Sequence, residues 1–435
     1  MGLPTWADIE SSHTVSVADQ IRFPVEKFKL NNGLTVLIHE DHSSPIFSYH
    51  QWFRVGSRHE QPGRTGLAHF FEHLMFKGTD KHPGKDYEKL IQGNGGSNNA
   101  FTNRDYTGYY TNLPSGKLPL VVDIESDRLV NLNFVQSEIN SEREVVKEER
   151  RFRTENNVMG TIWESLFSTV YKVHPYRWPV VGSMKDLNAA SMQDMKDFYR
   201  IYYAPNNSVV VVAGAVDTKE AKKLITEYYS KIPAQSIPAP KFVKEPEQGA
   251  PRKTTIRKDV QNATVAVSYL CPKSGEDDVF ALDLMSSILG EGSSSRLYKD
   301  LVYEKQLASS TSSFAYSMAE EGVCASILSL KPGKSSTTAL RHYQNQLSKL
   351  RTTPVSDKEL EKAKTMVIKG YVDSMKTVAG KARLMALNEI LFSDYSEMFK
   401  DIDRYNAVSK QDIMRVANKY LVPKKQSVIQ VLPKK

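Results

Sequence analysis

The 435-residue chain contains an internal repeat whose two copies lie 218 positions apart, about half the chain length. Residues 191–212 (SMQDMKDFYRIYYAPNNSVVVV) align without gaps to residues 409–430 (SKQDIMRVANKYLVPKKQSVIQ). In both copies a serine opens a helix-like segment with an aspartate three residues on, a proline ends it, and a strand-like stretch follows. The repeat predicts a tandem duplication of one α+β unit.

A proline-rich stretch lies between the two copies. Residues 231–253 (KIPAQSIPAPKFVKEPEQGAPRK) contain five prolines, which is typical of a linker. Each half has the pattern strand, strand, long helix, further helices, strand. We therefore predict a domain at 1–235, a linker at 236–252 and a similar α+β domain at 253–435.

Charge and hydropathy argue against two kinds of partner. The formal charge is +8, but Lys and Arg are spread along the chain, so the sequence does not predict a nucleic-acid surface. The longest uncharged apolar run, VVVVAGAV at 209–216, has the length of a strand, so no membrane span is expected.

The compartment stays open at this stage. Cys271 and Cys324 are too few for a disulfide framework and lack metal-ligand spacing, so we expect two buried thiols. The beginning MGLPTWADIESSHTV has no basic region followed by an apolar stretch. We expect a periplasmic or secreted protein if a leader has been removed, and a cytoplasmic protein otherwise.

The segment GLAHFFEHLMFKG, residues 66–78, places two histidines and a glutamate in an apolar setting. It is predicted to be a buried helix with His69, Glu72 and His73 on one face. Two imidazoles at i and i+4 can bind one ion, and the carboxylate beside them can polarise a water on that ion. The alternative is a pair of core histidines with satisfied hydrogen bonds. In the second half the corresponding positions are apolar, namely Ala281, Leu284 and Met285.

A catalytic zinc site needs a third protein ligand, and the segment 141–153 (SEREVVKEERRFR) offers carboxylates. As a helix it places Glu142, Val145, Val146 and Glu149 on one side, which we expect to be buried. Carboxylates beside an apolar stripe need a positive partner. That partner is a metal ion or, alternatively, an arginine or lysine in an ion pair.

These motifs resemble the inverzincins, the inverted zinc-motif peptidases related to pitrilysin, insulin-degrading enzyme and mitochondrial processing peptidase. The resemblance rests on HFFEH with a glutamate 76 residues after the second histidine, and it covers nearly the whole chain. Other matching segments are GGSNNAFTNRDYTGYY (95–110), HPYRWPVVGS (174–183) and GEGSSSRLYKDLVYEKQLA (290–308). The resemblance implies that His69, His73 and Glu149 bind one zinc ion, that Glu72 is the general base and that Glu142 is an accessory acid.

The resemblance also implies substrate-binding residues. Asn99, Ala100 and Phe101 are expected to line the site, where the substrate peptide adds to a sheet edge as an extra strand. The alternative for Asn99 is a turn. Arg296 is expected to anchor the substrate backbone, but its usual tyrosine companion is Ser309 here, so a surface ion pair is the alternative for Arg296.

The sequence thus predicts a zinc metalloendopeptidase of two similar α+β domains that cuts peptides or unfolded segments. In the family that it resembles, four such domains form a clamshell chamber, so a two-domain chain implies a dimer. Because Ser309 replaces the tyrosine, we expect a homologous partner subunit without the zinc motif, with a homodimer as the alternative. The alternative function is a non-catalytic peptide-binding or structural subunit.

Overall fold

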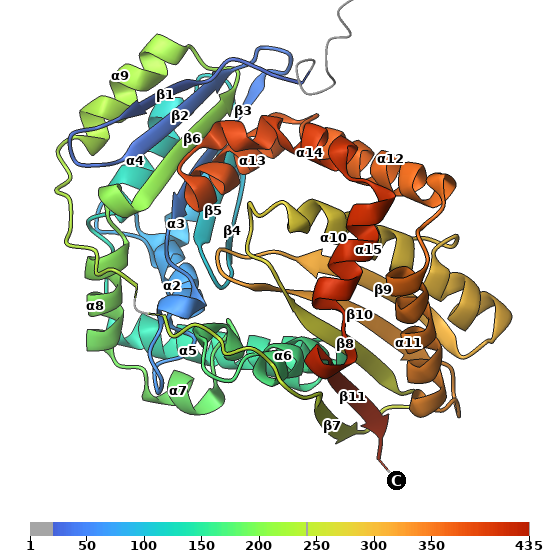
Figure 1. Ribbon diagram of the computed structural model, residues 1–435. Coiled ribbons are helices and arrows are strands. Elements are labelled where there is room, and N and C mark those ends of the chain that lie inside the picture. The colour runs from blue at the N-terminus through green and yellow to red at the C-terminus, as the bar shows by residue number, and fades with distance from the viewer. Residues whose placement is uncertain (1–20, 241, 435) are drawn as a thin grey trace, which may run out of the picture.

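Two β-sheets, one from each half of the chain, form the framework of the molecule (Figure 1). The structure is a computed structural model that describes residues 21–240 and 242–434. The first sheet contains, in spatial order, β1 (Glu26–Lys29), β2 (Thr35–Glu40), β6 (Ser208–Gly214), β3 (Ile46–Phe53), β5 (Thr107–Pro114) and β4 (Ser97–Thr102). The second contains β7 (Arg252–Lys258), β11 (Ser427–Pro433), β8 (Thr264–Cys271), β10 (Gly322–Leu330) and β9 (Ala308–Tyr316).

The two sheets share one topology. β6 lies between β2, to which it is parallel, and β3, to which it is antiparallel. In the second sheet β11 lies in the same way between β7 and β8. The strands β4 and β9 therefore hold equivalent places at the free edge of each sheet. This confirms the predicted α+β fold with two similar domains.

The repeated segment folds in the same way twice. α8 (Met192–Tyr202) and α15 (Lys410–Tyr420) both begin with a capping box, formed by Ser191 with Asp194 and by Ser409 with Asp412. Each cap satisfies backbone N–H groups that the first helical turn leaves unpaired. A short 3-10 turn at the proline then leads into the strand.

Helices cover both sheets. In the first half they are α2 (Leu67–Leu74), α3 (Gly84–Gly93), α4 (Leu118–Arg128), α5 (Gln136–Arg150), α6 (Val158–Val170), α7 (Met184–Ala189), α8 and α9 (Thr218–Tyr229). In the second half they are α10 (Asp278–Gly290), α11 (Ser336–Thr352), α12 (Asp357–Ser374), α13 (Val378–Phe392), α14 (Asp401–Ala407) and α15. Between α9 and β7, where the linker is predicted, the described residues form no helix or strand. None of the described helices is long and apolar enough to cross a membrane.

Each sheet is covered on one face by a helix from the other half of the chain (Figure 1). From the second half, α13 packs on β3 and β6, where Met385 shares a buried apolar cluster with Val209 and Val211. From the first half, α6 packs on β11 and β8, where Leu166 shares a cluster with Ile429. This exchange explains why β6 is apolar from Val209 to Ala213, since both of its faces are buried.

The two cysteines form a disulfide, which corrects the prediction of two thiols. Cys271 is on β8 and Cys324 is on β10, and their Cα atoms are 5.7 Å apart. The antiparallel pairing of these strands brings together two residues that lie 53 positions apart in the sequence. Their spacing along the chain carries no sign of that pairing.

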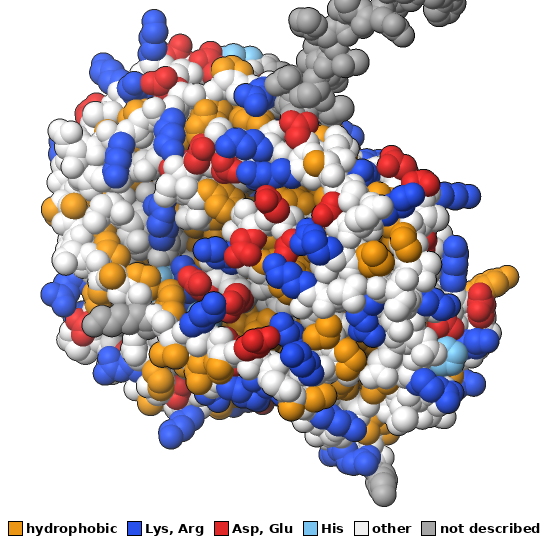
Figure 2. All heavy atoms as spheres, viewed as in Figure 1, with side chains coloured by type: hydrophobic (Ala, Val, Ile, Leu, Met, Phe, Trp, Pro, Cys, Tyr) orange, Lys and Arg blue, Asp and Glu red, His pale blue; other side chains and the backbone are white. Residues whose placement is uncertain are grey.

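The exposed charges are mixed. On the face seen in Figure 2, Lys and Arg side chains are interspersed with Asp and Glu. The expectation of no nucleic-acid partner stays a prediction.

Candidate metal centre

Hydrogen bonds at its N-terminus fix the position of the buried helix α2. Glu60 accepts hydrogen bonds from the backbone N–H groups of Gly66 and Ala68, both at 2.8 Å. Gly66 has a φ of 92°, and a Cβ atom there would lie 2.7 Å from the carbonyl oxygen of Val181, so only glycine fits. The helix predicted within 66–78 is confirmed as an α-helix that ends at Leu74, and a 3-10 turn over Met75–Lys77 continues it.

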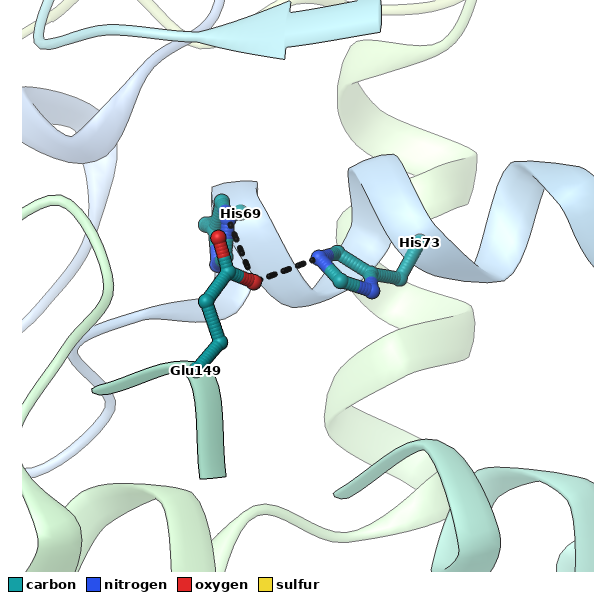
Figure 3. A group of neighbouring side chains, drawn as sticks. All are labelled: His69, His73 and Glu149. Atoms are coloured by element: carbon teal, nitrogen blue, oxygen red, sulfur yellow. Dashed lines mark ion pairs between the residues drawn. The ribbon is translucent and has the colours of Figure 1, made fainter. Parts of the chain in front are cut away.

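His69, His73 and Glu149 form the one group of potential metal ligands found among the described residues (Figure 3). The carboxylate of Glu149, on α5, points towards the ring nitrogens of both histidines on α2. Its Oε2 atom lies 3.6 Å from Nε2 of His69 and 3.2 Å from Nε2 of His73. Two ligand atoms of one tetrahedral zinc ion lie about 3.3 Å apart, so these separations fit the metal.

Two buried polar atoms beside this cluster have no hydrogen-bond partner within the described part of the chain. They are Oε2 of Glu72 and Nδ1 of His69. Buried polar atoms are normally satisfied, so the Glu72 oxygen calls for a water or an ion beside the cluster. Nδ1 of His69 points away from Nε2, so it calls for a separate partner such as a water. A donor set of two histidines and one glutamate, with an adjacent free carboxylate oxygen, fits a zinc ion that keeps one position open. The residues present therefore fit the expected metal.

Glu142 contacts a ligand and does not belong to the three-residue cluster. Its Oε1 atom lies 2.8 Å from Nδ1 of His73, and its other oxygen pairs with Lys77. Burial acts to raise the pKa of Glu142, but the hydrogen bonds from His73 and Lys77 outweigh it and lower that pKa. A carboxylate that accepts a hydrogen bond from the far nitrogen of a metal-binding histidine sets its tautomer and orientation. The ion pair that the sequence left open is thus present for Glu142, with Lys77, and also for Glu149, with Arg153.

The buried side of α5 differs from the prediction at one residue. Val146 is fully buried, but Val145 is 49% exposed. The 100° step between neighbouring positions places Val145 past the edge of the narrow contact with α2. Of the four residues predicted to share the buried side, Glu142, Val146 and Glu149 therefore face the core or the cluster.

The ionisable side chains of this site have pKa values that are shifted in different directions. Burial lowers the pKa of His69 to about 4. Burial opposes protonation of His73 as well, but its hydrogen bonds to Glu142 and Glu149 raise its pKa to about 9. The hydrogen bond from His73 lowers the pKa of Glu149 to about 2, and Arg153, 2.8 Å from Oε1, acts in the same direction. Burial raises the pKa of Glu72.

Asn99, Ala100 and Phe101 lie on β4, the edge strand of the first sheet, which packs beside α2. They are therefore in a strand, and the turn precedes them. Ala100 packs on the core that contains α2, whereas the ring of Phe101 packs on Trp52 with centroids 5.0 Å apart. The free edge of β4 is available for pairing, and the substrate-binding role of the three residues stays a prediction.

Arg296 is held away from the cluster. Its guanidinium makes a bidentate ion pair with Glu359, at 2.7 and 3.0 Å. It lines a different hollow, beside Lys299 and His342. Ser309 is on β9 and donates to the carbonyl oxygen of Ser329. Within one chain the surface ion pair is what the structure contains, and the role of Arg296 towards substrate stays a prediction.

Sequence reasoning missed residues that adjoin the cluster. A hollow of about 390 Å³ includes His69 and Glu149 in its lining, together with Arg153, Trp163, Phe167 and Tyr316. The sequence could have indicated Arg153 and Trp163 as neighbours of the site, because they lie on the two helical segments that follow Glu149. No sequence pattern indicated Tyr316, because this residue reaches the hollow from the edge strand of the second sheet.

The fold of this chain is also found in solved structures of proteases. A protease from Helicobacter pylori is similar over 95% of this chain and all of its own, with a TM-score of 0.91 and 30% identity. The first half of the periplasmic protease PqqL from Escherichia coli has a TM-score of 0.76 at 19% identity, over 94% of this chain and 92% of its own. The fold is that of the M16-like proteases.

The sequence places the chain within that class. Residues 35–183 match the model of insulinase (peptidase family M16), and residues 189–367 match the model of the peptidase M16 inactive domain. The zinc protease PqqE of Helicobacter pylori is 31% identical over 418 residues, which cover 94% of this chain and 93% of that protein. The chain belongs to peptidase family M16, as a short member with two domains. The part that matches the inactive-domain model includes α10, where Ala281, Leu284 and Met285 correspond to the three chemical residues of α2.

Proposed function

We propose that the chain is a zinc-dependent endopeptidase that hydrolyses peptides or unfolded polypeptide segments. The observation that carries the proposal is the cluster of His69, His73 and Glu149 beside a buried Glu72 oxygen without a partner. The name of the Helicobacter relative, a zinc protease, supports it.

His69, His73 and Glu149 would hold the ion. When bound, zinc supplies Lewis-acid polarisation and makes a water acidic enough to act as a nucleophile at neutral pH. Glu72, one helical turn from His69, would accept a proton from the attacking water and would later pass it to the nitrogen of the leaving amine. Glu142 keeps His73 oriented through Nδ1.

The free edge of β4 supplies the means of holding the peptide. Among residues 21–240 and 242–434, β4 pairs with β5 alone, so its outer N–H and C=O groups can pair with an extended substrate. Backbone pairing of this kind recognises an extended chain and excludes a folded one. Asn99, Ala100 and Phe101 would contact the substrate along this edge.

The test compares metal content and hydrolysis of a quenched peptide in matched variants. Glu72→Gln is expected to abolish hydrolysis while zinc stays near one ion per chain, because Glu72 lies beside the ligands and is not one of them. His69→Ala and Glu149→Gln are expected to lose zinc and activity together. Glu148→Gln, a neighbouring exposed carboxylate, is the control and should change neither. Loss of zinc in Glu72→Gln, or stoichiometric zinc without hydrolysis in the wild-type chain in its native assembly, would refute the proposed mechanism.

We also propose that the protein is exported. The buried disulfide between Cys271 and Cys324 supports this, because disulfides persist in oxidising compartments and are rare in the cytosol. PqqL of Escherichia coli, whose first half has a similar fold, is a periplasmic protease, which agrees with the proposal. Fractionation of cells that express the native gene tests the proposal, and recovery of the protein in the cytosolic fraction alone would overturn it.

A further inference from the structure

The segment 56–60 connects the edge strand β4 with the helix that carries the two histidines. The N–H group of Ser57 donates to the carbonyl oxygen of Asn103 at 3.1 Å, and that of Arg58 donates to the next carbonyl along the chain at 3.0 Å. Asn103 directly follows β4. A Cβ atom on Gly56 would lie 2.5 Å from the same carbonyl oxygen of Asn103, so the two backbones are in close contact. The segment is therefore fixed to the end of the edge strand.

Glu60, at the end of this segment, makes the connection to α2. One of its carboxyl oxygens accepts from the N–H group of Gly66 and the other from that of Ala68, at the start of the helix. The N-cap residue of α2 is Gly66, which has no side chain to cap the helix. The N–H groups of a first helical turn find no partner within the helix, so here they depend on Glu60. Ala68 immediately precedes the metal ligand His69.

The side chain of Glu60 lies apart from the reacting groups. It is 4% exposed and does not line the hollow that contains His69 and Glu149. It lines a separate hollow, together with Trp178 and Tyr202. Glu60 can therefore affect the reaction only through the elements that it holds in place.

We propose, on the basis of the peptidase function above, that Glu60 is a positioning residue that sets the place of α2 relative to the edge strand β4. A peptide paired with β4 is held where that strand lies, whereas Glu72 and the two histidines lie where α2 places them. The segment 56–60 joins the two elements through five residues, so the scissile bond and the catalytic groups keep one separation. This separation matters because a misplacement of about 1 Å can lower a rate by about 100-fold.

The test substitutes Glu60 in the full chain in its native assembly. Glu60→Gln keeps the size of the side chain and replaces one acceptor oxygen by an NH2 group, which cannot accept from a backbone N–H group. At saturating zinc, kcat for a quenched peptide is expected to fall roughly 10- to 100-fold while KM stays within about 2-fold, because the edge strand is unchanged. The dissociation constant for zinc is expected to rise roughly 10-fold or more, as it does when a residue that supports metal ligands is lost.

Asp412→Asn is the matched control. Asp412 accepts hydrogen bonds from the N–H and hydroxyl groups of Ser409 at the start of α15, in the second half of the chain. This variant should lower the melting temperature, as loss of a helix cap does, and leave zinc affinity and kcat unchanged. Wild-type zinc affinity and kcat in Glu60→Gln, or a rise in KM alone, would show that Glu60 only stabilises the fold and would overturn the proposal. An equal loss of zinc affinity in Asp412→Asn would overturn it as well.

Hydrogen exchange separates failure of this proposal from failure of the peptidase function. Exchange of single amides within residues 61–70 is followed by mass spectrometry in the zinc-free wild-type chain and in Glu60→Gln. The wild type is expected to protect the amides of Gly66 and Ala68 before zinc is added, and the variant is expected to lose that protection. This outcome, with weaker zinc binding, supports the role of Glu60 even if the wild type hydrolyses no peptide, a result that counts against the peptidase alone. Unprotected exchange of these two amides in the wild type would overturn the proposal, and this measurement holds even if Glu60→Gln does not fold.

Discussion

The Nδ1 atom of His73 lies 2.8 Å from Oε1 of Glu142, while Nε2 of the same ring faces Glu149. One imidazole is thus held between a carboxylate that can share a metal with it and a carboxylate that only orients it. We therefore expect Glu149 to bind the metal and Glu142 to orient His73.

Glu142→Gln is expected to lower turnover by about 10- to 100-fold while zinc content falls much less, because the amide is a weaker acceptor from His73 and a metal site with three intact ligands remains. Steady-state kinetics and metal analysis on the same sample test this. Glu144→Gln is the control, since Glu144 is exposed on the same helix and pairs with Lys147. Wild-type turnover in Glu142→Gln would leave Glu142 with a structural role only.

The carboxyl group of Asp283 should make stability fall as pH rises from about 4 to 6. Burial raises the pKa of Asp283 to about 6, aided by Asp401 and Glu291 and opposed by the hydrogen bond from Tyr405. The folded chain therefore keeps a proton that the unfolded chain, with a pKa near 3.8, has released, and this costs stability above that window.

Asp283→Asn removes this effect. The variant is expected to be more stable than wild type by about 2 kcal/mol at pH 7.5 and equal to it near pH 4. Denaturant unfolding at both pH values measures the difference, and Asp277→Asn, an exposed neighbour, serves as the control. An equal difference between wild type and Asp283→Asn at the two pH values would show that Asp283 does not titrate in this window.

The disulfide between Cys271 and Cys324 should be present in the purified protein. Thiol titration in denaturant is expected to find no free thiol before reduction and two after it. Reduction should lower the free energy of unfolding by about 4 kcal/mol, the chain-entropy value for a loop closed across 53 residues. Two thiols that titrate without reductant would show that the disulfide is absent and that the sequence-based prediction of two thiols was right.

The chain is expected to work as a dimer, with a homologous subunit that lacks the zinc motif as the favoured partner. Two domains form half of the four-domain enclosure that the family resemblance implies, and Ser309 stands where the companion of Arg296 is expected. Mass in solution and peptidase activity of the chain purified alone test this. Full activity as a homodimer, unchanged in Arg296→Ala, would refute both the need for another subunit and the role of Arg296.

A control for Arg296 follows from its ion pair with Glu359. If Arg296 only stabilises the fold, Arg296→Ala and Glu359→Gln should lower the melting temperature alike and leave KM unchanged. If it also contacts substrate, Arg296→Ala alone should raise KM.

Much of the site could be predicted because its signals are local. The i, i+3 and i+4 spacing of His69, Glu72 and His73 puts them on one helical face whatever surrounds the helix. Glu149 was assigned through the family resemblance, and the packing of α5 on α2 brings it to the histidines. Val145 shows the limit of prediction from helical periodicity. Periodicity gives the direction in which a side chain points from the helix axis, but it does not give the width of the helix face that neighbouring elements cover.

By itself, the sequence determined that the chain is a duplication of one α+β unit and that only the first copy carries the chemical residues. Capping boxes, helix periodicity and repeat spacing act over a few residues, so they can be read without the fold. The tertiary structure alone decided the exchange of α6 and α13 between the halves, the pairing of Cys271 with Cys324, and the meeting of Tyr316 with Trp163 beside the metal cluster. These contacts join residues from 53 to more than 150 positions apart, and they depend on how whole sheets and helices pack. Packing of this kind is driven by the burial of apolar surface, which is non-directional. No local sequence pattern therefore predicts which elements pack together.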